Sequence, residues 1–272
     1  SNTANALSGA VSLTTSGTAG DVTIDNGTTA LGVQGTVSGN LALTSGGAIT
    51  DSAALNVSGT TTVTTDVDDI TITLGTLAST GNVILTTQGT AGNVTIDNGT
   101  TALGVQGTVS GNLALTSGGA ITDSAALSIS GTTTVTTDVA DKTITLDSLA
   151  STGAVLLTTS GTAGDVVIDN GTTALDLGAS TISGTLSATS GAAAGIVDSG
   201  NIAVSGDVTL TTDANNGVIN VGTLQQSGGD LVLTTNGTGD ATVVNNAAID
   251  FGTSSVGGAL SATASAGTIT QN

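Results

Sequence analysis

The side chains in this sequence that could do chemistry are almost all aspartates and threonines. All 20 acidic residues are Asp, Lys142 is the single basic residue, and His and Cys are absent. Nucleophilic triads and imidazole general bases cannot be built without His or Cys. With a net charge of −19, the chain also lacks the Lys and Arg that neutralise nucleic-acid phosphates. We therefore expect neither an enzyme nor a nucleic-acid-binding protein.

The densest acidic cluster is the candidate metal site. It consists of Asp66, Asp68 and Asp69, and calcium takes several oxygen ligands of this kind. The corresponding segment of the next repeat has Ala140 in place of the second Asp and ends with Asp141-Lys142, an exchange that favours a solvated turn. We expect no cofactor, with calcium at this cluster as the alternative.

Paired Asp carboxylates could also hydrolyse glycosides. Sugar-processing clefts, however, add aromatic platforms and basic residues, and Phe251 is the one aromatic residue of the chain. We predict that Phe251 fills the core rather than stacking on a ligand, because large apolar side chains are most often buried.

A threonine recurs in an apolar-x-apolar-Thr segment along the whole chain. If the apolar residues point inward, the threonines point outward and could form a ladder of eleven hydroxyls. The residues between them are mixed, which argues against the flat double column typical of ice-binding surfaces, so the first interpretation is a structural ladder. The threonines are Thr14, Thr44, Thr64, Thr86, Thr116, Thr136, Thr158, Thr189, Thr211, Thr234 and Thr263.

These threonines belong to a longer internal repeat. Residues 22–55 are identical to residues 94–127, and a third copy begins near Val166. This 72-residue repeat has copies at about 15–86, 87–158 and 159–234, with a partial copy at 235–272. The threonines mark shorter units inside each copy. One long unit is followed by two short ones, as the intervals from Thr14 to Thr44, from Thr44 to Thr64 and from Thr64 to Thr86 illustrate.

Short strands account for the pattern between the turns. Apolar and polar residues alternate in segments such as 55–58, 61–65 and 70–74, and Asn-Gly or Ser-Gly pairs separate them. A unit of this size cannot bury its apolar side alone, so stacked copies must cover one another. The sequence predicts a single all-β domain over 1–272, a right-handed parallel β-helix (β-solenoid) of about eleven coils of roughly 20–30 residues, each with three short strands. Since the sequence has no Met, we expect a segment of a longer chain.

Segments 38–50 and 54–63 resemble the repeats of filamentous-haemagglutinin-like adhesins and autotransporter-type bacterial surface exoproteins. The resemblance implies a right-handed parallel β-helix, export from a Gram-negative cell and a stalk or fibre role. It transfers no functional residue, because the repeats carry no catalytic motif.

From these patterns we expect a non-enzymatic, extracellular stalk or fibre segment of a bacterial surface adhesin. The alternatives are a matrix filament of copies stacked end to end, a calcium-dependent surface module and an ice-binding solenoid. The expected partners are the chain itself or flanking coils, together with surface glycans or proteins of a host or neighbouring cell. No apolar run is long enough for membrane insertion.

Overall fold

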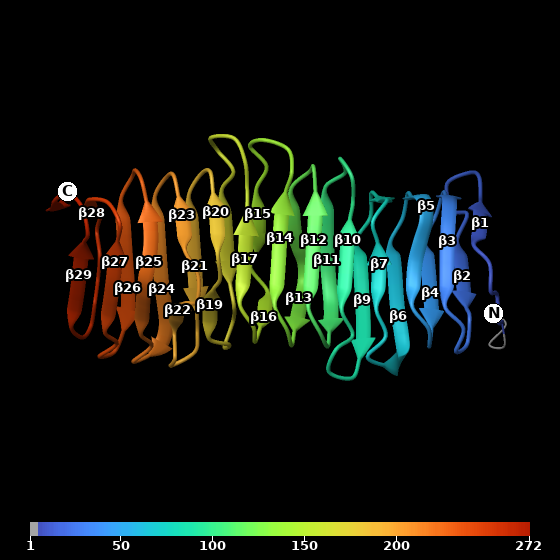
Figure 1. The fold of residues 1–272 in the computed structure, drawn as a ribbon, viewed down its shortest axis with the longest axis horizontal. Coiled ribbons are helices and arrows are strands. Elements are labelled where there is room, and N and C mark those ends of the chain that lie inside the picture. Colours follow the sequence, from blue (N-terminus) through green and yellow to red (C-terminus); the bar gives the residue numbers. More distant parts are fainter. Residues whose placement is uncertain (1–4) are drawn as a thin grey trace. The chain divides into compact units, whose positions relative to one another are not determined.

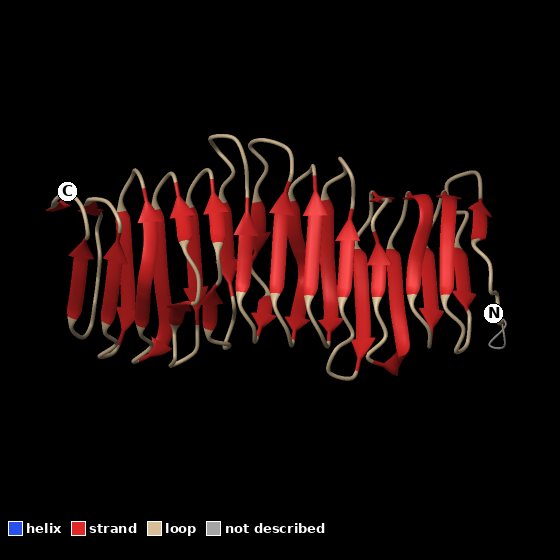
Figure 2. Ribbon diagram, viewed as in Figure 1, coloured by secondary structure: helices blue, strands red, loops and turns tan. Residues whose placement is uncertain are grey.

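The structure is a computed structural model that describes residues 5–272. All thirty regular elements in that range are β-strands, joined by short loops (Figures 1 and 2). None of the described elements is a helix of the length and apolarity that crossing a membrane would need. The chain divides into two compact units, Ser1–Thr133 and Thr134–Asn272, and each is described separately.

The first unit contains two parallel sheets, here called sheets I and II. Sheet I has the order β1-β3-β5-β7-β10-β12, with β8 also paired to β5, and sheet II has the order β2-β4-β6-β9-β11-β13. The strands are β1 (Val11–Thr14), β2 (Val22–Asp25), β3 (Leu31–Val37), β4 (Leu41–Ser45), β5 (Ile49–Val57), β6 (Thr61–Asp68), β7 (Ile72–Leu74), β8 (Leu77–Ser79), β9 (Val83–Gln88), β10 (Val94–Asp97), β11 (Leu103–Val109), β12 (Leu113–Ser117) and β13 (Ile121–Ile129). The chain passes alternately between the two sheets, so that one turn of the solenoid crosses both.

The second unit repeats this arrangement in sheets III and IV. Sheet III contains β14, β17, β19, β20, β22, β23, β25, β27 and β29, and sheet IV has the order β15-β18-β21-β24-β26-β28-β30. The strands are β14 (Thr133–Thr137), β15 (Ile144–Leu146), β16 (Leu149–Ser151), β17 (Val155–Thr158), β18 (Val166–Asp169), β19 (Leu175–Leu177), β20 (Ser180–Ile182), β21 (Leu186–Ser190), β22 (Ile196–Asp198), β23 (Ile202–Val204), β24 (Val208–Asn215), β25 (Ile219–Gln226), β26 (Leu231–Asn236), β27 (Ala241–Asn245), β28 (Ile249–Phe251), β29 (Leu260–Ala264) and β30 (Ile269–Gln271).

Equivalent residues of successive turns lie side by side, which is the defining property of a solenoid. Leu43 pairs with Val63, and Val63 pairs with Leu85, all in parallel register. These three side chains point inward and are almost fully buried, because alternate residues of a strand face opposite sides of its sheet. The predicted all-β parallel solenoid is therefore confirmed, with about twelve turns instead of eleven. Right-handedness and the single domain stay predictions.

The core is a narrow layer of Val, Leu and Ile between the two sheets of each unit. Small and branched side chains pack well into such a thin layer, which accounts for the almost complete lack of aromatic residues. Phe251 lies in this buried set, so the prediction that it fills the core is confirmed.

The predicted three strands per sequence unit describe some turns, such as the one formed by β6, β7 and β8, but not every turn. Strand pairing joins Val22 to Leu41 and Leu41 to Thr61, so a turn is shorter than the longer units marked by the threonines. The predicted strands themselves exist, since 55–58, 61–65 and 70–74 overlap β5, β6 and β7. The error lay in the assumption that every recurrence of the sequence motif returns to the same sheet.

The 72-residue repeat corresponds to three and a half turns. Residues 22–25 and 94–97 are identical in sequence, yet they form β2 in sheet II and β10 in sheet I. Between β2 and β10 the chain crosses from one sheet to the other seven times. Each copy of the repeat therefore begins on the sheet opposite to that of the copy before it.

Candidate functional site

The eleven predicted threonines do not form one ladder. In the first unit, Thr14 and Thr116 lie in sheet I, whereas Thr44, Thr64 and Thr86 lie in sheet II. In the second unit, sheet III holds Thr136, Thr158 and Thr263, and sheet IV holds Thr189, Thr211 and Thr234. The prediction of a continuous column is wrong because the longer intervals, such as that from Thr14 to Thr44, are one and a half turns and move the motif to the other sheet.

Shorter threonine ladders do exist on the outer surfaces. Thr44, Thr64, Thr86 and Thr108 are consecutive neighbours in sheet II. The adjacent column contains Ala42, Thr62, Ile84 and Gln106 in the same order. Because the residues of this adjacent column differ in type, the surface carries only one regular row of hydroxyls, that of the threonines. This row is a ladder of β-branched side chains that stabilises the sheet.

The predicted calcium ligands do not converge. Within residues 5–272 no group of three acidic side chains lies close enough to hold a metal ion, and this includes Asp66, Asp68 and Asp69. The carboxylate of Asp69 is instead directed to the next turn, where it accepts hydrogen bonds from the backbone N–H groups of Thr90 and Ala91, both at 2.7 Å. Calcium dependence stays a prediction.

The same backbone contact recurs in the next copy of the repeat. Asp141 accepts N–H groups from Thr162 at 2.7 Å and Ala163 at 2.9 Å. Asp69 and Asp141 both adopt a φ of 62°, a left-handed conformation that Asp tolerates better than most residues. Hydrogen bonds from these N–H pairs lower the pKa of each carboxyl below its ordinary 3.8, because they stabilise the charged form.

Other recurring aspartates also accept backbone N–H groups from the following turn. Asp21 accepts from Asn40 at 2.7 Å, and Asp165 accepts from Thr185 at 2.8 Å. The carboxylate of Asp51 accepts from two successive N–H groups, those of Gly75 and Thr76. These contacts hold one turn to the next, so the aspartates act as structural acceptors at the corners of the solenoid.

The recurring aspartates Asp25 and Asp97 are not stacked on other carboxylates in the sheets. Asp25 lies beside Thr44, and Asp97 lies beside Thr116. Both carboxylates accept the N–H of the second residue after them, a glycine, which forms an Asx-turn. Since equivalent aspartates are three and a half turns apart, their mutual repulsion is avoided.

Four buried asparagines are the most elaborate polar sites, and our sequence reasoning missed them. They are Asn26, Asn98, Asn170 and Asn245, all with 0% exposure. The Asn98 side chain accepts the N–H of Ser79 at 2.8 Å and donates to the carbonyl oxygens of Ser79, Thr101 and Ala102 at 2.9 to 3.1 Å. The amide thus extends the strand pairing around a corner, where it substitutes for a backbone peptide group.

Asn170 makes the corresponding contacts with Ser151, Thr173 and Ala174. The signal that could have revealed this role is the recurrence of Asn at identical positions of successive copies. Local sequence favours an exposed turn at Asp-Asn-Gly instead, because Asn and Gly both tolerate turn conformations.

Buried hydroxyls satisfy further carbonyl groups at the corners. Thr87 donates to the carbonyl oxygen of Gly92 at 2.9 Å, and Thr159 donates to that of Gly164 at 2.7 Å. Each follows directly after an outward-pointing threonine of the predicted ladder. The inward member of each Thr-Thr pair therefore serves the interior, as buried polar groups require.

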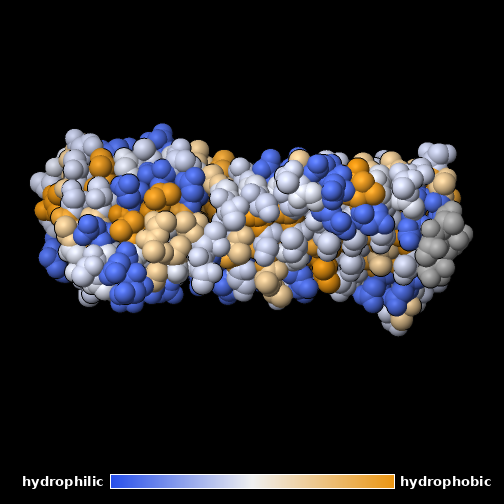
Figure 3. Space-filling view, turned by 90° about the horizontal axis from the view of Figure 1, so that it is seen from below, coloured by the Kyte–Doolittle hydropathy of each residue, from blue (hydrophilic) through white to orange (hydrophobic). Residues whose placement is uncertain are grey.

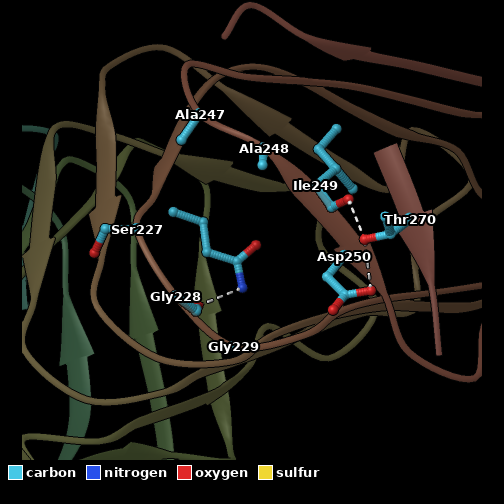
Figure 4. Close-up of a pocket in the computed structure, with 9 residues that line it drawn as sticks. Ser227, Gly228, Gly229, Ala247, Ala248, Ile249, Asp250 and Thr270 are labelled. Atoms are coloured by element: carbon cyan, nitrogen blue, oxygen red, sulfur yellow. Dashed lines mark hydrogen bonds between the residues drawn. The ribbon is translucent and has the colours of Figure 1, made fainter. Parts of the chain in front are cut away.

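A surface hollow of about 300 Å³ lies in the second unit (Figure 4). Its rim includes Gln226, Gly228, Asp250 and Thr270. The Gln226 amide donates to the carbonyl oxygen of Gly228, and the Thr270 hydroxyl donates to Asp250. These side chains bond to the protein itself.

The outer surface shown in Figure 3 is mostly polar or neutral, with apolar residues in small separate areas. Large exposed apolar residues such as Val67, Val139 and Val167 are single residues on loops or strands. Isolated apolar residues of this kind are normal on soluble proteins.

Parallel strands in continuous register, together with corner contacts repeated copy after copy, define a repeat β-solenoid. The chain belongs to the family described as repeats of unknown function (DUF5649), whose model matches residues 19–86, 91–161, 163–231 and 238–272. No curated protein and no solved structure matches the chain. Membership of this family supports a repeat protein and leaves the resemblance to adhesins as a proposal.

Proposed function

We propose that this chain is a non-enzymatic structural element outside the cell, a stiff spacer or stalk segment of a bacterial surface adhesin. The observation that carries the proposal is the attachment of each turn to the next by side chains as well as by backbone. Asp69, Asn98 and Asp141 all bond across to a neighbouring turn. A chain held at its corners in this way resists bending and extension.

Three further observations support a mechanical role. The recurring polar side chains are engaged in internal contacts, so few remain to make a specific binding site. The net charge of −19 favours solubility and discourages non-specific association between like molecules. The resemblance of segments 38–50 and 54–63 to exported repeats supports an extracellular location and bacterial surface partners.

A spacer must lengthen in proportion to its number of repeats, and this can be measured. Because the chain has no Cys, dye pairs can be attached uniquely at Thr36→Cys and Thr108→Cys. Two or four further copies of residues 22–93 are then inserted after Asn93, because only a pair of copies returns the second dye to its original sheet. At about 4.8 Å per turn, each pair of copies is seven turns and adds about 34 Å to the separation of the dyes along the stack of turns.

Single-molecule energy transfer reports the separation and its spread. We expect equal increments and a narrow distribution for each number of inserted copies. A separation that grows with the square root of the inserted length, as in a flexible linker, contradicts the spacer role.

A further inference from the structure

Five Asn-Gly pairs occur in the chain, and in such a pair the asparagine side chain can react with the backbone nitrogen that follows it. Glycine has no Cβ that would shield this nitrogen, and it gives the backbone the freedom that ring closure needs. Whether a pair reacts then depends on whether the fold lets the nitrogen reach the side chain. The pairs begin at Asn26, Asn98, Asn170, Asn216 and Asn236.

In the first three pairs the fold directs the two reacting groups to other partners. The three asparagines are buried with 0% exposure, and their amides bond to backbone groups around the corner. The glycine nitrogen donates instead to the carboxylate that precedes the asparagine, as Gly99 does to Asp97 at 2.9 Å. Gly27 and Gly171 make the same contact. A nearby negative charge favours the protonated form of the nitrogen, so these pairs are protected.

The fourth pair is protected by different contacts. Gly217 is buried, and its N–H donates to the carbonyl oxygen of Ala214 at 3.0 Å. The side-chain oxygen of Asn216 accepts the N–H and the hydroxyl of Thr238 at 2.8 Å and 2.9 Å. Both reacting groups of this pair are therefore held by other partners.

The fifth pair has the opposite arrangement. Asn236 is the last residue of β26, and both Asn236 and Gly237 are exposed. The Gly237 N–H donates to the side-chain oxygen of Asn236 itself, with 2.8 Å between nitrogen and oxygen. Because this oxygen is bonded to Cγ, the nitrogen lies next to the carbon that it must attack. Groups held so close to each other react faster than groups that must first find this geometry.

We propose that Asn236 is a modification site, at which the Gly237 nitrogen closes a cyclic imide that water then opens to Asp or isoAsp. The nitrogen loses its proton to solvent and forms a bond to Cγ. The bond from Cγ to Nδ2 breaks, and Nδ2 takes up a proton and leaves as ammonia. Water adds to one of the two carbonyl carbons of the ring and breaks the bond of that carbon to nitrogen. Opening at Cγ gives Asp, opening at the backbone carbonyl gives isoAsp, and nothing is oxidised or reduced.

The modification loosens one corner of the second unit. The Asn236 amide donates to the carbonyl oxygen of Asp213 in the preceding turn at 3.2 Å, and a carboxylate cannot donate in its place. IsoAsp also lengthens the backbone at the residue whose carbonyl oxygen accepts the Asn216 N–H at 3.0 Å. The inference is independent of the spacer role.

Peptide mapping of the folded chain after incubation at mildly alkaline pH tests the proposal. Cleavage before Asp places each Asn-Gly pair in a separate peptide, and mass spectrometry follows the replacement of each amide by a carboxyl group. We expect Asn236 to react at least about ten-fold faster than each of the other four asparagines. The cleavage sites that precede the five pairs are Asp25, Asp97, Asp169, Asp213 and Asp230.

Incubation in concentrated urea removes the influence of the fold. There we expect the five pairs to react at similar rates, because no persistent structure positions or protects them. In the folded state, Asn236→Gln should lose most of the ammonia release, since its longer side chain would have to close a larger ring. Asn220→Gln, at an exposed asparagine of β25 that precedes Val221, is the matched control and releases ammonia like the unmodified chain. Circular dichroism verifies that both variants are folded.

Three results would each overturn the proposal. The first is a folded chain in which any other Asn-Gly pair reacts within ten-fold of the rate of Asn236. The second is a slower reaction of Asn236 in the folded chain than in urea, because the fold would then hinder the attack instead of positioning it. The third is an Asn236→Gln variant that releases ammonia like the unmodified chain.

Discussion

Three of the buried asparagines, Asn26, Asn98 and Asn170, each make four hydrogen bonds through the side-chain amide. Asn98 has 0% exposure and joins Ser79, Thr101 and Ala102 through its amide. Only an amide can both accept and donate in this geometry, since a carboxylate cannot donate to the carbonyl oxygens. We infer that Asn is required here by its hydrogen-bonding pattern more than by its preference for turns.

Replacing Asn98 by Ala removes these bonds and leaves buried backbone groups unpaired. Each unpaired buried group costs about 1–3 kcal/mol, and we expect the free energy of unfolding to fall by about 3 kcal/mol. Urea denaturation followed by circular dichroism measures the loss. Asn56→Ala is the control, because Asn56 is exposed on the outer side of β5, and we expect a change within about 0.5 kcal/mol. Equal midpoints for the two variants would argue against the role given to Asn98.

The aspartates at left-handed turns predict a specific dependence of stability on pH. Backbone N–H groups lower the pKa of Asp69 and Asp141 from 3.8. A lowered pKa in the folded state means that the contact contributes stability above pH 3.8 and loses it as the pH falls through the folded value. The double variant Asp69→Asn, Asp141→Asn keeps the acceptor oxygens and removes this titration.

We therefore expect the melting temperature of the double variant to decrease less than that of the unmodified chain when the pH is lowered from 5 to 2. Asn is compatible with the backbone, because Asn216 occupies the corresponding position with a φ of 62° and accepts the Thr238 N–H at 2.8 Å. Asp68→Asn, on a neighbouring exposed residue, is the matched control and retains the acid sensitivity. If the melting temperatures of all three proteins decrease equally across this pH range, protonation of Asp69 and Asp141 does not affect stability.

At the scale of the strand, a bulge in β13 is accommodated by a glycine in β11. The register shifts between Val105 and Gly107 on β11, where β13 accommodates extra residues. Gly107 has a φ of 122°, and a Cβ there would collide with the carbonyl oxygen of Leu85. The strand therefore needs glycine at this point for both its conformation and its close approach.

Gly107→Ala is expected to lower the free energy of unfolding by at least about 2 kcal/mol, from strain and from the collision. Gly75→Ala is the matched comparison, since no atom lies within 4 Å of a Cβ at that position. Urea denaturation of the pair measures the difference. A Gly107→Ala protein as stable as Gly75→Ala would mean that the bulge relaxes without cost.

Alternation of apolar residues is enough to predict the strands, because each strand has one buried face. It also predicts that Leu43, Val63 and Leu85 stack, since the two intervals between them are single turns. The change of sheet is not predicted, because an interval as long as that from Thr14 to Thr44 also fits one long coil. The corner contacts of Asn98 depend on partners in another turn, and local sequence does not reveal such partners.

At the scale of the whole molecule, the large negative charge raises the question of cation dependence. The carboxylates of Asp51, Asp69 and Asp141 are compensated by backbone N–H groups. Since these oxygens already have partners, we expect the melting temperature to stay within about 1 °C when a chelator is added. Salt should raise it modestly by screening repulsion between like charges.

Melting is followed by circular dichroism, because the chain has no Trp or Tyr. Calcium chloride and potassium chloride are compared at equal ionic strength to separate specific binding from screening. A higher melting temperature in calcium alone would support a site at Asp66, Asp68 and Asp69.

The half-turn offset between successive copies has a consequence for how such a protein can change by recombination. Residues 22–55 and 94–127 are identical, and identical tracts allow unequal crossing-over to delete or add a copy. Loss of one copy shifts every later strand onto the sheet opposite to its former one, whereas loss of two restores the original side. Whether the number of copies is odd or even would then determine which side of the solenoid any downstream region faces.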